Sequence, residues 1–178
     1  MRTDPTPLAR DAVVVRPARG RDARALRDLL REVVAEGRWI RSRRALRTVG
    51  DERRRTRRSW TDDRAYLVAE VGRAVVGSLE IVRDRSEATR HVATFGMHVA
   101  RAHRGRGVGT ALLREALRWA EAVGVRKVEL SVYPDNAAAL ALYASFGFRE
   151  EGRLARHSLR GDGFADELLM GRWLGEDG

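Results

Sequence analysis

Apolar residues recur with helical spacing in three segments of the chain. After Asp22, leucine and valine follow at i, i+3, i+4, i+7 and i+8 until Gly37 (Leu26, Leu29, Leu30, Val33 and Val34). A second amphipathic pattern runs from about Gly107 to Val123, and a third begins at the helix-capping residue Asn136 and ends near Gly147. The spacing therefore predicts three helices, each with one face directed at a core. A few apolar residues between Arg38 and Trp60 predict one or two further short helices with a solvated face.

Between these segments, short runs rich in β-branched residues predict strands. Two of them, Tyr66–Val71 and Ala74–Val82, are separated only by Gly72-Arg73 and predict a hairpin. Other strands are expected at Val13–Val15, at His91–Val99, at Lys127–Val132 and, joined by Arg160–Gly163, in the two halves of Phe148–Trp173. The order of elements predicts an α+β (mixed α/β) fold. We expect a mostly antiparallel twisted sheet of about 6–7 strands, about four flanking helices and one β-α-β crossover.

The composition is that of one folded domain. The chain has 178 residues, of which 43% are hydrophobic, so we expect a single domain over residues 12–175 behind a loose arm, residues 1–11. It has no cysteine, which excludes disulfides and thiolate nucleophiles, and its four histidines lack metal-binding spacing, so no metal is expected. No apolar run approaches the roughly 20 residues of a membrane span. The N-terminus lacks the apolar stretch of a signal peptide, so we expect a cytoplasmic protein.

The formal net charge of +10 is concentrated in one segment. Between Arg38 and Arg58, ten arginines face only Asp51 and Glu52, a local net charge of +8 (10 − 2). Such a charge is compatible with polyanionic partners. No helix-turn-helix or aromatic RNA-binding signature accompanies it, so nucleic acid is not the expected partner.

A glycine-rich turn, Arg104-Gly105-Arg106-Gly107-Val108-Gly109, joins a predicted strand to a predicted helix. The free amides of such a turn, with the positive end of the helix dipole, form a site for phosphate oxygens. A Walker A loop is excluded because no lysine follows the glycines. The dinucleotide fingerprint fails because Thr110 stands where its third glycine belongs.

The pattern that fits is [Arg/Gln]-x-x-Gly-x-[Gly/Ala], present as Arg104, Gly107 and Gly109. Downstream, the segment from Asn136 through Tyr143 to Phe148 matches N-x-x-A-x-x-L-Y-x-x-x-G-F. With these two motifs the sequence resembles the GNAT superfamily of acyl-CoA N-acyltransferases. The resemblance implies a GNAT-like sheet with the crossover at the CoA site, and an acetyl-CoA-dependent N-acetyltransferase that acts by direct attack of a small primary amine in a ternary complex.

The resemblance also implies roles for individual residues. The pyrophosphate of acetyl-CoA is expected on the turn, formed by Arg104, Gly105, Arg106, Gly107, Val108, Gly109 and Thr110. The strand end at His98 and Val99 is expected to pair with the pantetheine arm, and an amide there to stabilise the oxyanion of the thioester. Asn136 is expected to help hold the pantetheine. Tyr143 is the expected general acid, which protonates the leaving thiolate.

The general base stays open at this point. Where some relatives carry a glutamate, this chain has Thr94, Phe95 and Gly96. Glu80 acting through water, His98, and a chain of waters are the alternatives.

The acceptor also stays open. In the family the segment between the first two helices shapes the acceptor pocket, so the Arg38–Arg58 block either favours an acidic acceptor or is a solvated face. Family members are often homodimers. The competing functions are acetylation of protein N-termini, a non-catalytic CoA-binding module and an RNA-associated module.

Overall fold

The computed structural model describes residues 12–39 and 47–175, so the arm over residues 1–11 and residues 40–46 of the arginine-rich segment lie outside the described residues. The helices are α1 (Ala23–Ala35), α2 (Val49–Thr56), α3 (Val108–Ala122) and α4 (Ala137–Ser145). The strands are β1 (Val13–Pro17), β2 (Trp60–Thr61), β3 (Arg64–Val71), β4 (Ala74–Arg83), β5 (Val92–Val99), β6 (Lys127–Val132), β7 (Arg149–Arg160) and β8 (Gly163–Trp173).

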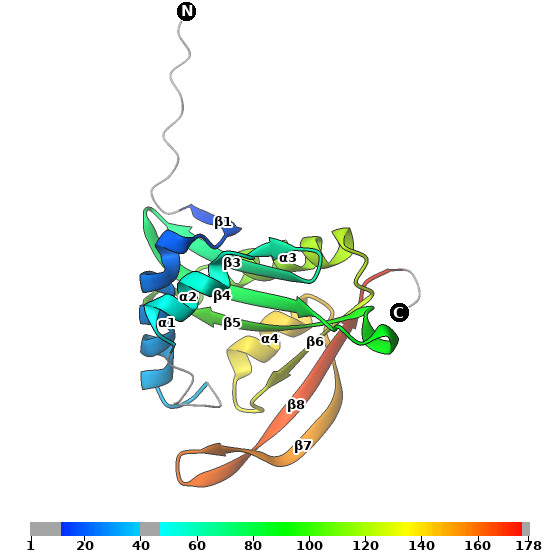
Figure 1. The fold of residues 1–178 in the computed structure, drawn as a ribbon. Helices are drawn as coiled ribbons and strands as arrows, with labels where there is room; N and C mark the ends of the chain where they lie inside the picture. Colours follow the sequence, from blue (N-terminus) through cyan, green and yellow to red (C-terminus); the bar gives the residue numbers. More distant parts are fainter. Residues whose placement is uncertain (1–11, 40–46, 176–178) are drawn as a thin grey trace, which may run out of the picture.

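One sheet contains all eight of these strands (Figure 1). Their order is β1-β3-β4-β5-β6-β8-β7, with the short β2 beside β3. Every neighbouring pair is antiparallel except β5 and β6, which are parallel because α3 forms the crossover between them. The mixed fold with a mostly antiparallel sheet is therefore confirmed. The two-residue β2, too short to leave an alternating pattern, is an addition to the expected strands.

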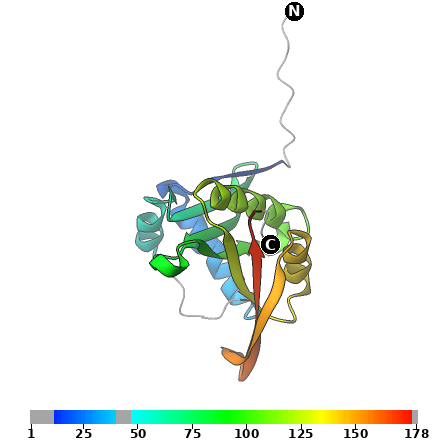
Figure 2. The ribbon, with the colours of Figure 1, turned by 90° about the vertical axis from the view of Figure 1, so that its right-hand side faces the viewer.

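The two faces of the sheet carry different helices, as strand alternation requires. On β3, Ala65, Leu67 and Ala69 belong to the large core that includes α3. Tyr66 and Val68 point the other way and pack with Leu26 of α1. Helices α1 and α2 thus cover one face, and α3 and α4 cover the other (Figures 1 and 2).

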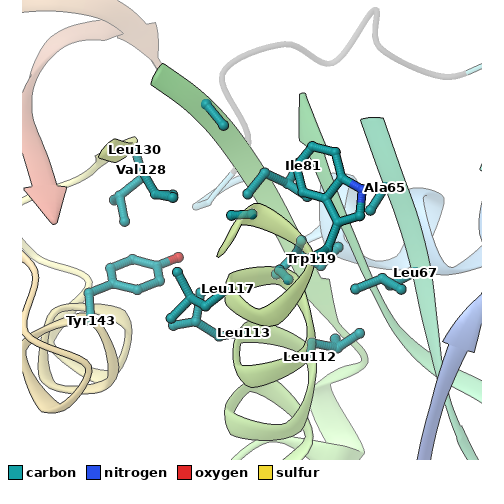
Figure 3. Packing of buried hydrophobic residues seen from close by; sticks show 14 of the residues in the cluster. Ala65, Leu67, Ile81, Leu112, Leu113, Leu117, Trp119, Val128, Leu130 and Tyr143 are labelled. Carbon is teal, nitrogen blue, oxygen red and sulfur yellow. The ribbon is translucent and has the colours of Figure 1, made fainter. Parts of the chain in front are cut away.

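The large core centres on α3 (Figure 3). Its Trp119 is 2% exposed and lies beside Ile81 of β4, while its indole N–H donates to the carbonyl of Thr61 at 2.9 Å. That hydrogen bond satisfies a buried polar group and ties β2 to the helix. The glycine at position 77 lets β4 approach α3, because a Cβ there would meet Val108 Cγ1 at 2.9 Å.

The feature that positions the site is a split in the sheet. Strands β5 and β6 pair only from Val92–Lys127 to Thr94–Glu129. Beyond Thr94, β5 continues to Val99 alongside β4, whereas β6 continues alongside β8. Strands β6, β8 and β7 lead away from β5, and the long β7–β8 hairpin extends from the body of the molecule (Figures 1 and 2).

Candidate functional site

A cavity of about 400 Å³ lies at this split. It extends to both faces of the sheet, because α4 lines it on one side and α1 on the other. The lining residues are Phe95, Gly96, Met97 and His98 of β5, Leu130, Ser131, Val132 and Tyr133 on or just after β6, Asn136 and Tyr143 at α4, Glu167 of β8, Val33 of α1, and Trp39.

The β5 backbone offers hydrogen-bonding groups to the split. The amide of Ala100 donates to Val76 of β4, and the carbonyl of His91 accepts from Lys127 at the start of β6. The register between β4 and β5 is uninterrupted over this length, so odd-numbered residues of β5 direct their backbone groups away from β4. The C=O of Phe95, both backbone groups of Met97 and the N–H of Val99 therefore face the gap beyond the last residue pair with β6. The C=O of Val99 also points this way and accepts from Arg104. An extended ligand can pair there as an added strand does.

The glycine-rich turn lies at the end of β5. Gly105 and Gly107 have φ values of 70° and 79°, which glycine adopts at little cost and other residues rarely do. Gly107 is the N-cap of α3, and its carbonyl accepts from the amide of Ala111 at 2.9 Å. The amides of Val108, Gly109 and Thr110 precede that first intrahelical bond and have no acceptor within the helix. The turn can therefore bind a phosphate group with backbone N–H groups.

The two arginines of the turn differ. Arg106 is exposed, whereas Arg104 donates from Nε to the carbonyl of Val99 at 3.0 Å and from both terminal nitrogens to Glu36 of α1 at 2.8 and 2.5 Å. This ion pair raises the pKa of Arg104 and lowers that of Glu36. A neighbouring carboxylate, Glu32, accepts from the amide of Arg101 at 2.8 Å. Arg104 thus braces the turn against α1, and Arg106 is the guanidinium that faces solvent.

Tyr143 is brought into the cavity by α4, which begins at Asn136. The Asn136 side chain accepts from the amide of Ala139 at 3.3 Å, as a helix cap does. The ring of Tyr143 meets Phe95 edge-on at 5.6 Å between centroids and extends toward Leu113 and Leu117 of α3 (Figure 3). Burial raises the pKa of its hydroxyl to about 12, so Tyr143 is protonated at neutral pH.

Glu80 and His98 occupy the face of the sheet that α1 and α2 cover. The Glu80 carboxylate forms ion pairs with Arg55 and with Arg64, the latter at 2.6 Å, and it is not among the described residues that line the cavity. His98 does line the cavity, and burial, aided by the charge of Arg47, lowers its pKa to about 4. The structure therefore brings Tyr143, His98 and Asn136 together and leaves Glu80 apart, with two guanidinium groups on its carboxylate.

Acidic partners engage much of the described arginine-rich segment. Arg47 and Arg55 contact the buried Glu52, which also accepts from the Tyr66 hydroxyl at 3.1 Å. Residues 40–46 lie outside the described residues. Within the described part, the charge of Arg47 acts on His98, which lines the cavity, and helps to lower its pKa.

Several lining residues were not expected from the sequence, among them Ser131, Tyr133 and Glu167. Glu167 is 2% exposed and accepts a hydrogen bond from the Ser131 hydroxyl. The signal that could have found it is an acidic residue directly before the apolar run Leu168-Leu169-Met170 of a predicted strand. Within residues 12–39 and 47–175, no three metal-ligating side chains cluster, and no helix is long and apolar enough to cross a membrane.

Comparison with known proteins gives a consistent result. The model of the "Acetyltransferase (GNAT) family" matches residues 34–148. An L-amino acid N-acetyltransferase of Escherichia coli is 36% identical over 107 residues, which are 60% of this chain and 66% of that protein. An N-alpha-acetyltransferase of Mycobacterium tuberculosis is 40% identical over 111 residues, or 62% of this chain and 67% of that protein.

Among solved structures, a GCN5-related N-acetyltransferase from Kribbella flavida superimposes with a TM-score of 0.80 at 31% identity, over 92% of this chain and 98% of that one. The matches to curated relatives span between 41% and 67% of the length of those proteins. The likeness to solved structures, by contrast, extends over nearly the whole fold.

Proposed function

Because the chain belongs to the acetyltransferase (GNAT) family, we propose that it transfers the acetyl group of acetyl-CoA to the primary amine of a small molecule. The observation that carries this proposal is the cavity at the split. It joins backbone groups of β5 that face the gap to the protonated Tyr143, and the left-handed glycine turn follows β5 after one short 3-10 helix, Arg101–His103. These are the parts that a pantetheine thioester with a pyrophosphate requires.

Each part has a role in this reaction. The amides of the turn and of the first turn of α3 bind the pyrophosphate, and Arg106 adds a full charge. The backbone groups of Phe95, Met97 and Val99 hold the pantetheine arm in the split. One of their N–H groups stabilises the oxyanion as the amine attacks the thioester carbonyl. Tyr143 donates its proton toward the thiolate that leaves, while the rest of the barrier is lowered by positioning.

We infer that the acceptor is an amino acid or a related amine with an acidic group. Helix α1 lines one side of the cavity, and on the same face of the sheet Arg47, Arg55 and Arg64 gather around Glu52 and Glu80, outside the described lining. Guanidinium groups bind carboxylates in a bidentate manner, so they suit the carboxylate of an amino acid. The likeness to an L-amino acid N-acetyltransferase supports the same class.

A second candidate is acetylation of a protein N-terminus, which the likeness to an N-alpha-acetyltransferase favours. One assay separates the two. CoA release is followed with a thiol reagent, for which the absence of cysteine from the chain removes any protein background. Free amino acids, their methyl esters and short peptides are compared by kcat/KM.

Preference for free amino acids over both esters and peptides supports the main proposal, and preference for peptides supports the second candidate. Binding of acetyl-CoA with no turnover on any amine would indicate a non-catalytic module. The exposed pair Leu159 and Phe164 at the tip of the β7–β8 hairpin is a surface on which two copies could pair. Light scattering tests this homodimer.

A further inference from the structure

The acceptor side of the cavity contains a buried acid. Glu167 lies on β8, opposite Leu154 of β7, with only 2% of its surface exposed. It is the only carboxylate among the described residues that line the cavity. Its Oε2 accepts a hydrogen bond from the hydroxyl of Ser131, a residue of β6 that lines the same cavity. The carboxylate is therefore oriented by a neighbour at the wall of the site.

The location of this acid relative to the split decides what it can do. Tyr143 reaches the cavity from α4, on one side of the sheet. Tyr133, which follows β6, has its hydroxyl against Ser158 of β7, and its ring lies under Arg160. An amine that approaches from the α1 side thus lies between Glu167 and the backbone of β5. Because Glu167 is buried, its carboxylate attracts an ammonium group more strongly than a carboxylate in bulk water does.

Several charged and titratable groups on the neighbouring strands have contacts of their own. His98 of β5, whose pKa is lowered to about 4, is neutral at pH 7 and lends no positive charge. Arg160 of β7 pairs with both oxygens of Asp135 at 2.8 and 2.7 Å. On β6, Glu129 is engaged by Lys127 at 2.8 Å.

We propose that Glu167 binds the ammonium group of the acceptor and takes up the proton that this nitrogen loses. The inference rests on the proposed function. An N–H bond breaks and an O–H bond forms on the carboxylate, and the freed nitrogen lone pair forms the bond to the acetyl carbon. The C–S bond then breaks, its electron pair leaves on sulfur, and the Tyr143 hydroxyl donates toward that sulfur. Glu167 returns its proton to solvent after the product leaves.

The deciding variant is Glu167→Gln, measured by CoA release with the best acceptor of the panel at several pH values. At pH 7, kcat/KM for the acceptor is expected to fall about 100-fold, within the usual range for a proton-transfer residue. The deficit should shrink about tenfold per pH unit toward pH 9, because the variant depends on the free amine, whose fraction rises tenfold per unit below its pKa near 10. The dissociation constant of acetyl-CoA should stay within twofold.

Asp166→Asn is the matched control. It removes a carboxylate one residue away, which accepts from the amide of Arg156 at 2.8 Å and does not line the cavity. Its kcat/KM and pH profile should equal those of the wild type. Ser131→Ala is a second test, needed if the glutamine variant does not fold. It removes the hydrogen bond that orients the carboxylate, so kcat/KM for the acceptor at pH 7 should fall severalfold while the dissociation constant of acetyl-CoA stays unchanged.

The inference is overturned if Glu167→Gln retains kcat/KM within threefold of the wild type at pH 7. It is also overturned if Ser131→Ala keeps the kcat/KM of the wild type for the acceptor at pH 7. A wild-type protein that releases no CoA with any amine would instead refute the proposed function.

Discussion

Replacing Tyr143 with phenylalanine removes one hydroxyl and keeps the ring. The ring packs edge-on against Phe95 at 5.6 Å and lies 6.0 Å from Phe148, and both contacts survive the change. We therefore expect the fold and the binding of acetyl-CoA to be preserved. Only the proton donor at the leaving sulfur is lost, which makes the variant a clean test of the general acid.

The structure sets the size of the effect. Burial holds the pKa of Tyr143 at about 12, whereas an alkyl thiol has a pKa of about 8.5. Complete transfer of the proton is therefore uphill by roughly 5 kcal/mol, at 1.36 kcal/mol per pKa unit. The hydroxyl acts mainly as a hydrogen-bond donor to the developing thiolate, an interaction of about 1.5–3 kcal/mol. Its removal should lower kcat about 10- to 150-fold.

The assay is steady-state release of CoA, with acetyl-CoA affinity measured separately by calorimetry. Tyr133→Phe is the matched control, since it removes a second tyrosine hydroxyl of the same cavity that is already engaged by Ser158 at 3.2 Å. It should lower kcat no more than about threefold, well short of the loss expected for Tyr143→Phe. If Tyr143→Phe keeps kcat within twofold, or loses acetyl-CoA affinity as much as kcat, the assignment of Tyr143 as the acid is refuted.

Three further predictions concern the turn, a buried charge and pH. Gly107→Ala should lower the free energy of unfolding by about 1–2 kcal/mol, because its φ is 79°, and the control Gly124→Ala, at φ 77°, should do the same. Only Gly107→Glu should weaken CoA binding, by at least about 100-fold in calorimetry, because it places a negative charge at the phosphate site. Unchanged affinity would contradict the phosphate site. Glu52→Ala should lower the free energy of unfolding, measured in urea, by about 3–5 kcal/mol, because the partners of this 1% exposed carboxylate are left without it. Tyr66→Phe, which removes only one hydrogen bond to Glu52, should lower it by about 1 kcal/mol. The pKa of His98 is about 4 in the folded state and about 6.5 in the unfolded state. The contribution of His98 to the free energy of unfolding is therefore fully present above pH 6.5, and it is lost, by about 3 kcal/mol, as the pH falls toward 4. Equal falls in the wild type and His98→Gln would exclude His98 as the cause.

Much of the fold follows from the sequence because its signals are local. The apolar spacing after Asp22 gives α1, and alternation gives the β3–β4 hairpin and β6. The glycine-rich turn could be predicted for the same reason, because glycine itself permits the positive φ values found at Gly105 and Gly107. Tyr143 could be placed in the cavity through a motif on a single helix.

What the sequence could not decide depends on residues far apart along the chain. The split between β5 and β6 arises because β6 continues with β8, a pairing partner some 40 residues later. Glu80 lies on a strand as expected, yet its carboxylate is held by Arg55 and Arg64.

Glu167 reaches the cavity only because the sheet brings β8 beside β6. Local hydrogen bonding and periodicity determine which element forms, but only long-range strand pairing and burial determine which side chains share a site. The sequence by itself therefore determined the elements and the glycine-rich turn, and the tertiary structure decided which carboxylate lines the cavity.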